Sequence, residues 1–221
     1  MTEAEWLASD EPDLMLEFVC GEGYDRKRRL FAVACCDRIA HLVATEPSRH
    51  SVEVARRMAD GLNLPGERRA AVIAAMADED TTPAAACVCA VSAHEAAVRT
   101  SAHAAIAVVR EHFPELYESG ERIPEWHAIT GRESLAQSFI LRDIFGNPFR
   151  PVSFSPSWRT DTALALARTM YEAREFSAMP ILADALQDAG CDNTDVLDHC
   201  RDTSLTHVRG CWVVDLVLGK Q

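Results

Sequence analysis

The sequence predicts an all-α protein, a multi-helix, bundle-like fold with a helical amino-terminal part and a compact helical carboxy-terminal module. Three observations support this fold class. Alanine is abundant, whereas aromatic residues make up only 7% of the 221-residue chain. Apolar side chains recur at helical spacing. Glycine and proline lie mainly between these periodic segments, where they end one helix and begin the next.

The first half of the chain carries a series of helix start signals. Thr2 and Glu5 form a capping-box pattern, and Thr82 followed by Pro83 marks a later start. The expected helices are a short one after Thr2 and then 14–19, 26–44, 51–62, 65–76 and 83–113. The last of these is rich in small side chains, which allow close packing, and a break is expected near Thr100-Ser101.

A basic run, Arg26-Lys27-Arg28-Arg29, opens the expected helix at 26–44. Four successive residues point around the whole helix, so they cannot form one flat basic patch. A solvated helix entrance is therefore the favoured interpretation, and an anion-binding site is the alternative.

Residues 114–131 contain two prolines and two glycines and are predicted to form a loop or hinge. This divides the chain into an Ala-rich helical part, 1–113, and a helical carboxy-terminal module, 132–221, with one continuous domain as the alternative. Apolar residues return to helical spacing before Gly146, which predicts another helix there. The pairs Asn147-Pro148 and Arg150-Pro151 then predict an extended segment of chain, because the residue before a proline is disfavoured in the α conformation. Further helices are expected after Thr160, from Ser177 to Gly190, from 194 to about 201, and at 208–218, where an edge strand fits less well.

The formal net charge of −12 repels phosphate backbones and anionic lipid. Nucleic acid and membrane surfaces are therefore not expected as partners, and the expected partner is a protein. The sequence does not indicate the oligomeric state. Eight cysteines follow an amino terminus without a basic and apolar leader pattern. They are expected to be reduced thiols in a cytoplasm.

Several blocks carry a resemblance to a known family. They are TEAEWL (2–7), LFAVACC (30–36), LRDIFGNPFRP (141–151), MPILADAL (179–186) and HVRGCWVVDL (207–216). In these blocks the chain resembles a heavily duplicated, uncharacterised family of planctomycete bacterial proteins. The resemblance implies a bacterial cytoplasmic setting and brings no assigned activity.

The clearest group of chemistry-bearing residues lies near the end of the chain. Thiolates and imidazoles are ligands that zinc prefers, and Cys191, Cys200, His207 and Cys211 could form a closed structural site. His207 and Cys211, four residues apart, would face one side of a helix. The spacing matches no standard zinc motif, and separate roles as buried thiols and hydrogen-bonded histidines remain the favoured interpretation.

Two further sets of residues are candidates for function. Cys191 or Cys200 could act as a nucleophile with His207 or His199 as its base and Asp184 or Asp195 orienting the imidazole. Adjacent His199 and Cys200 point about 100° apart on a helix and make a poor pair, so Cys191 with His207 is the freer combination. Three arginines beside Gly and Pro turns are expected to clamp orphan carbonyls or a carboxylate such as Asp143 or Asp184; the alternative is an anionic ligand site. These arginines are Arg142, Arg150 and Arg209.

Common catalytic and cofactor-binding signatures are absent from the sequence, so it favours a protein that is not an enzyme and leaves the question open. The leading hypothesis is a non-catalytic cytoplasmic scaffold or protein-interaction domain without a cofactor. A zinc-stabilised Cys/His module is the first alternative, and a thiol-dependent enzyme is the second.

Overall fold

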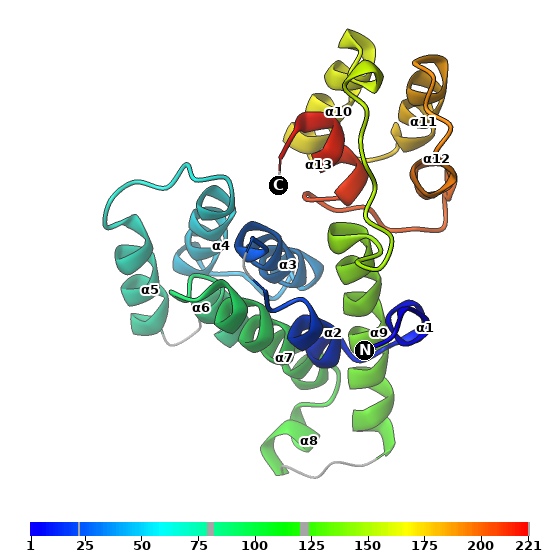
Figure 1. The fold of residues 1–221 in the computed structure, drawn as a ribbon. Helices are drawn as coiled ribbons and strands as arrows, with labels where there is room; N and C mark the ends of the chain where they lie inside the picture. Colours follow the sequence, from blue (N-terminus) through cyan, green and yellow to red (C-terminus); the bar gives the residue numbers. More distant parts are fainter. Residues whose placement is uncertain (22, 79–81, 120–123, 221) are drawn as a thin grey trace. The chain divides into compact units, whose positions relative to one another are not determined.

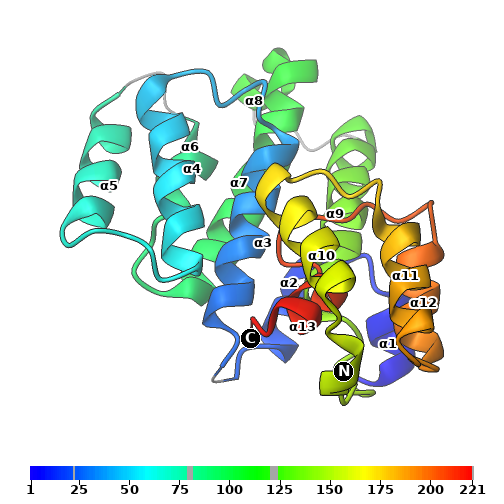
Figure 2. The same ribbon diagram turned by 90° about the horizontal axis from the view of Figure 1, so that it is seen from above.

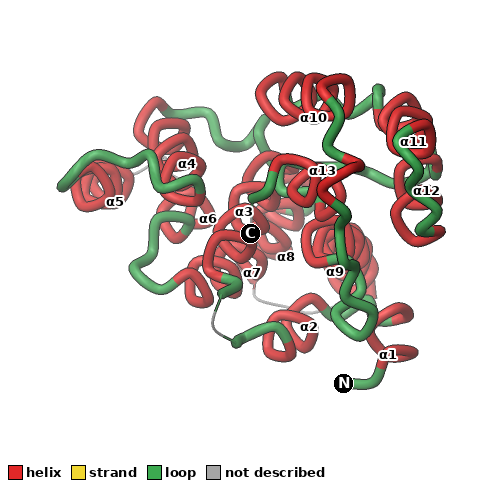
Figure 3. Tube along the Cα trace, turned by 45° about the horizontal axis from the view of Figure 1, so that its top comes forward, coloured by secondary structure: helices red, strands yellow, loops and turns green. Residues whose placement is uncertain are grey.

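A computed structural model describes residues 1–21, 23–78, 82–119 and 124–220. Within these ranges the chain forms helices and loops and no β-strand, which confirms the predicted all-α class (Figure 3). The helices fall into two compact units, Met1–Ser138 and Phe139–Gln221. We refer to them as the amino-terminal unit and the carboxy-terminal unit. Among the described helices, none has the length and hydropathy that a bilayer crossing requires.

The amino-terminal unit is built around α3, whose residues from Leu30 to Cys36 are all buried. A helix that is apolar on every side belongs in the middle of a core, and α3 packs against both α4 and α7 (Figures 1 and 2). The helices of this unit are α1 (Glu3–Ala8), α2 (Pro12–Phe18), α3 (Asp25–Arg38), α4 (Glu46–Ala59), α5 (Glu67–Ala77), α6 (Pro83–Cys87), α7 (Ala93–His112), α8 (Pro114–Ser119) and the first part of α9 (Pro124–Phe145).

The long helix expected at 83–113 is divided, but not where the sequence predicted. Thr100 and Ser101 lie buried inside the continuous α7 helix, so the expected break there is wrong. The break lies between α6 and α7, where the hydroxyl of Ser92 caps α7 by accepting a hydrogen bond from the Glu95 N–H at 3.3 Å. Small side chains then let α7 pack closely on α3.

The basic run at the start of α3 is not a solvated entrance, so the favoured interpretation of it was wrong. Arg28 is only 4% exposed. Its guanidinium donates to the carbonyl oxygens of Val19 at 2.7 Å and Gly21 at 2.6 Å, which follow α2. Arg29 reaches a different loop and donates to the Ala90 carbonyl at 3.0 Å. Because the side chains diverge around the helix, Arg28 and Arg29 satisfy the backbone of separate neighbours, and Arg26 pairs with the Asp60 carboxylate at 3.3 Å.

The loop or hinge predicted at 114–131 is largely helical, which corrects that prediction. Pro114 begins α8 and Pro124 begins α9, while residues 120–123 lie outside the described part of the chain. Proline is favoured at the first position of a helix, so these prolines mark starts instead of a loop. Gly131 lies inside α9, where glycine costs about 1 kcal/mol relative to alanine. The division between the two units falls after Ser138.

The carboxy-terminal unit begins in the last part of α9. An irregular segment follows, and the unit continues with the 3₁₀ turn η1 (Pro156–Trp158), α10 (Asp161–Ala173), α11 (Met179–Asp188), α12 (Thr194–Arg201) and α13 (Trp212–Leu218). Helix α11 pairs with α12, and α10 packs against both α11 and α13. The predicted helix near the end of the chain is confirmed as α13, and Gly219 ends it in the left-handed conformation.

Gly146 joins the end of α9 to the irregular segment and has a positive φ of 68°. The indole of Trp212 packs against it, so that a Cβ added at Gly146 would lie 3.1 Å from Trp212 Cγ. Two constraints therefore require glycine at this position: the backbone conformation and the close approach of an aromatic ring. This contact joins the segment after α9 to the start of α13.

We expect Gly146→Ala to lower the free energy of unfolding by about 2–4 kcal/mol, because it adds backbone strain and a clash with Trp212. Gly190→Ala is the matched control, since Gly190 has a φ of 86° and nothing within 4 Å of an added Cβ. It should cost about 1–2 kcal/mol from backbone strain alone. Urea unfolding followed by far-ultraviolet circular dichroism measures both values, and equal losses would contradict the packing argument.

Candidate metal centre

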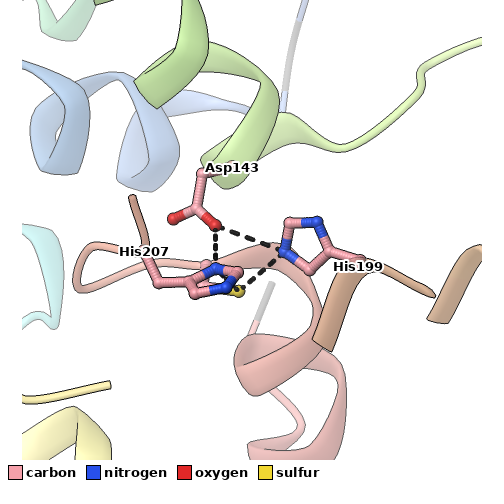
Figure 4. Close-up of side chains that lie close together, drawn as sticks. Asp143, His199 and His207 are labelled. Carbon is pink, nitrogen blue, oxygen red and sulfur yellow. Dashed lines mark hydrogen bonds and ion pairs between the residues drawn. The ribbon is translucent and has the colours of Figure 1, made fainter. Parts of the chain in front are cut away.

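Four side chains from separate parts of the carboxy-terminal unit meet at one point, and Figure 4 labels three of them, Asp143, His199 and His207. Asp143 lies in the last turn of α9, and His199 lies on α12. His207 is in the loop that follows α12, and Cys211 is the N-cap residue of α13. Their potential ligand atoms all lie within 4.8 Å of one another. This is the one such group found among the described His, Cys, Asp and Glu residues.

The contacts within this cluster are short. Asp143 Oδ1 lies 2.7 Å from Nδ1 of His207 and 3.2 Å from Nε2 of His199. The Sγ atom of Cys211 lies 3.2 Å from Nε2 of His199 and 3.9 Å from Nδ1 of His207. The other carboxylate oxygen of Asp143 accepts the backbone N–H of Val208 at 2.8 Å. The carboxylate is thus oriented by the same loop that supplies His207.

The cluster is shielded from solvent, which makes its charge balance important. Asp143 is 3% exposed and Cys211 is fully buried, while the side chains of His199 and His207 are 11% and 6% exposed. Burial by itself raises the pKa of the Asp143 carboxyl, but the hydrogen bonds from His199 and His207 outweigh it and the net pKa is lowered. Asp143 is therefore an ionised carboxylate near the C-terminus of α9, where the helix dipole disfavours negative charge.

The pKa of the Cys211 thiol shifts in the opposite direction to that of the Asp143 carboxyl. Burial, reinforced by the nearby Asp143 carboxylate, raises the pKa of Cys211 well above its usual value. A divalent cation reverses this preference, because a coordinating thiol gives up its proton. With one carboxylate, one thiolate and two neutral imidazoles around it, a 2+ ion gives a site with no net charge. Charge neutrality removes most of the cost of burying ionised groups at this depth.

The distances between the ligand atoms also fit a tetrahedral ion. Ligands about 2.1 Å from a tetrahedral zinc lie about 3.4 Å from one another, somewhat more where sulfur is one of the pair. The four distances that join oxygen or sulfur to an imidazole nitrogen, from 2.7 to 3.9 Å, bracket this value. The other two pairs of ligand atoms lie within the 4.8 Å that holds for the whole group, so side-chain adjustments would let the four atoms surround an ion.

The same geometry does not match a catalytic triad. In a triad, one imidazole nitrogen faces the nucleophile and the other nitrogen faces the orienting carboxylate. Here Nε2 of His199 faces both the Asp143 carboxylate and the Cys211 sulfur, and Nδ1 of His207 does the same at longer distance from the sulfur. Each ring presents one nitrogen to a common centre, which is the arrangement of metal ligands.

Two of the four predicted zinc ligands, His207 and Cys211, belong to this cluster, and two do not. Cys191 and Cys200 are buried in the hydrophobic core of the carboxy-terminal unit. The N–H of Cys191 donates to the Leu186 carbonyl at 2.9 Å, which closes the C-terminal cap of α11 beside Gly190. Among the described residues, Asp143 and His199 converge with His207 and Cys211, whereas Cys191 and Cys200 are not part of that group.

Sequence reasoning missed Asp143 and His199 as partners in one site. His199 and Cys200 are adjacent on α12 and point about 100° apart, so only one of them could face the cluster while the other entered the core. The sequence did not show which. The position of Asp143 in the sequence could have indicated a partner. It lies two residues before the end of a helix, where the helix dipole disfavours a carboxylate, so that the carboxylate needs a compensating contact.

The other predicted site residues lie elsewhere. Asp184 is exposed and lies 3.2 Å from a guanidinium nitrogen of Arg201, while the carboxylate that contacts His207 is Asp143. The proposed triad of Cys191, His207 and Asp184 is therefore not formed as predicted, because its base, His207, contacts a carboxylate other than that of Asp184.

Aromatic rings lie beside two of the three predicted clamp arginines. The guanidinium of Arg209 lies 4.2 Å from the Tyr171 ring centroid, and that of Arg142 lies 5.6 Å from the Phe139 centroid. Arg150 is exposed. Their predicted ties to carbonyls or carboxylates stay predictions. Arg159, which sequence reasoning did not select, does make such a tie, donating to the Leu216 carbonyl of α13 at 2.9 Å.

Comparison of the chain with family models, curated proteins and solved structures finds no match.

In metal-free protein, we expect Asp143→Asn to lower the free energy of unfolding at pH 7 by roughly 2–3 kcal/mol, because it removes a buried charge that two imidazoles contact. Since the folded pKa of Asp143 is lowered, its contribution is present above the unfolded value of about 3.9 and is lost as pH falls through the folded pKa. The stability difference between wild type and Asp143→Asn should therefore shrink below about pH 4.

Asp184→Asn is the matched control for this experiment, because Asp184 carries the same group at an exposed position. It should change stability little at any pH. Denaturant titrations of the three proteins in chelator, repeated from neutral to acidic pH, measure these differences. A constant difference between wild type and Asp143→Asn across that range would show that the Asp143 charge is not what stabilises the cluster.

Proposed function

We propose that the protein is a non-catalytic cytoplasmic interaction protein whose carboxy-terminal unit is stabilised by one structural zinc ion. Asp143, His199, His207 and Cys211 are the proposed ligands. The observation that carries the proposal is the convergence of their four ligand atoms within 4.8 Å of one another in a site that solvent scarcely reaches.

The number and burial of the ligands favour a structural role over a catalytic one. Catalytic zinc ions usually have three protein ligands and keep one position for water or substrate, whereas structural zinc ions are surrounded by four. The proposed site supplies four, and its thiol is fully buried. A substrate would have to displace a protein ligand to reach the ion.

The chemistry of the donor set favours zinc over other abundant cations. Calcium and magnesium prefer sites made entirely of oxygen ligands. One sulfur, two imidazole nitrogens and one carboxylate oxygen suit a borderline-soft cation with tetrahedral geometry. Zinc meets both requirements and brings no redox chemistry of its own.

A structural ion would fix a segment of the chain that has no regular secondary structure to neighbouring helices. Residues 202–211, between α12 and α13, contain no helix or strand, yet this segment supplies His207 and Cys211. Zinc would fix it to α9 through Asp143 and to α12 through His199. Because such a site forms only in the folded chain, the binding free energy adds to folding stability.

The state of the other thiols supports the non-catalytic and cytoplasmic parts of the proposal. Burial raises the pKa of the Cys191 thiol, and burial with the nearby Cys191 and Asp143 groups raises that of Cys200 to about 12. A thiol nucleophile needs the opposite shift, so these groups are poor nucleophiles at neutral pH. All eight cysteines are free, and seven of them are buried, as suits a reducing compartment.

Protein purified without chelator should contain about one zinc ion per chain, as measured by inductively coupled plasma mass spectrometry. His199→Ala and Cys211→Ala should lose this zinc, because three remaining ligands bind far more weakly. They should also lose the increase in melting temperature that added zinc gives to the metal-free wild type.

Cys191→Ala and Cys200→Ala are the matched controls, and they distinguish the observed cluster from the set predicted by sequence. Both should retain about one zinc ion per chain, even if a smaller core side chain lowers their stability. Loss of zinc in these two variants, with retention in His199→Ala, would support the cysteine-rich set. Wild-type protein with well under half a zinc ion per chain would contradict a structural site altogether.

A further inference from the structure

Helices α1 and α2 form the two sides of an open groove on the amino-terminal unit, with a volume of about 580 Å³. Its apolar lining residues are Met1, Ala8 from α1, and Leu14 and Phe18 from α2. Leu14 is 50% exposed and Phe18 is 38% exposed. Exposed apolar side chains that line one concave surface commonly mark an interaction site, whereas the same residues scattered singly need no explanation.

The position of these side chains follows from how the two helices are anchored. Trp6 of α1 and Met15 and Leu16 of α2 are completely buried. Leu14 and Phe18, one helical turn apart, consequently point away from the buried side of α2. The Phe18 ring lies 6.1 Å from the Trp6 ring, so it is fixed against the core on one side while it lines the groove on the other.

Carboxylates line the same groove as these apolar side chains. The groove is lined by four acidic residues, and no basic side chain is among its lining residues; the four are Glu5, Asp10, Glu11 and Glu17. All four are exposed. Residues 1–19 contain six Asp or Glu residues, and the first basic residue of the chain is Arg26. The carboxylates therefore repel one another, and no side chain of residues 1–19 carries a positive charge to offset the repulsion; the α-amino group of Met1, which acts on Glu5, offsets it in part.

We propose that this groove binds a basic amphipathic helix of a partner protein. Two apolar side chains of the partner, one helical turn apart, would cover Leu14 and Phe18, as in other complexes where a helix lies in a groove. Lysine or arginine side chains on either side of that apolar stripe would lie opposite the four carboxylates. Apolar contact supplies affinity, and the complementary charges select the partner and speed its association.

This inference is independent of the proposed zinc site, because it rests only on residues of α1, α2 and the turn between them. The probe for its test is a fluorescein-labelled synthetic helical peptide with leucines four residues apart, lysines flanking them and alanine elsewhere. Fluorescence anisotropy against zinc-loaded full-length protein measures its affinity. We expect saturable binding that weakens as the salt concentration rises, because the charges that attract the peptide are exposed.

Leu14→Ala should weaken binding about tenfold, since it removes most of one apolar contact. Leu7→Ala is the matched control, because Leu7 is 53% exposed on α1 but does not line the groove. It should leave the affinity unchanged. Glu17→Gln should weaken binding and reduce its salt dependence, whereas Glu172→Gln, which removes an exposed charge in the carboxy-terminal unit, should do neither.

Three results would overturn the inference. One is the absence of saturable binding at low salt. Another is equal binding of a peptide in which glutamine replaces every lysine, since the acidic rim would then have no role. The third is self-association that Leu14→Ala abolishes in analytical ultracentrifugation, because a second copy of this chain would then be the occupant of the groove. Zinc analysis of each variant separates these outcomes from any failure of the metal site.

Discussion

The buried carboxylate of Asp143 is the point at which several segments of the carboxy-terminal unit meet. Its two oxygens contact both imidazoles of the cluster and the backbone N–H of Val208. An ionised group at this depth is destabilising unless it is paired, and the nearby end of α9 adds to that cost. The residues that gather around it therefore have a physical reason to do so, and the divalent ion proposed here completes the charge balance.

Around this carboxylate, polar contacts and an aromatic packing contact join the same segments of the carboxy-terminal unit. The polar cluster joins the end of α9 to α12 and to the loop before α13, and Trp212 packs on Gly146 directly beside it. The imidazole of His199 lies 5.2 Å from the Trp212 ring, so the polar and aromatic contacts adjoin. Because Asp143 and Gly146 precede the irregular segment and His207 to Trp212 follow α12, these contacts are formed by residues far apart in the sequence.

Local sequence patterns predicted the all-α class, the capping box at Thr2 and the final helix, because each depends on neighbouring residues. They failed where the outcome depends on distant contacts. Helical spacing could not show that Arg28 bonds carbonyls following α2, or which of two adjacent residues on α12 faces the cluster. His207 and Cys211 do meet, but through a loop and a helix cap instead of one helix face, and their partner Asp143 comes from more than sixty residues away.

The most direct test of this account is X-ray absorption at the zinc edge of the metal-loaded protein. The proposed ligands predict one sulfur at about 2.3 Å and three nitrogen or oxygen ligands at about 2.0–2.1 Å. Two or more sulfurs would mean that Cys191 or Cys200 binds the ion, and six nitrogen or oxygen ligands without sulfur would mean that Cys211 does not. Either result would contradict a site built on Asp143, His199, His207 and Cys211.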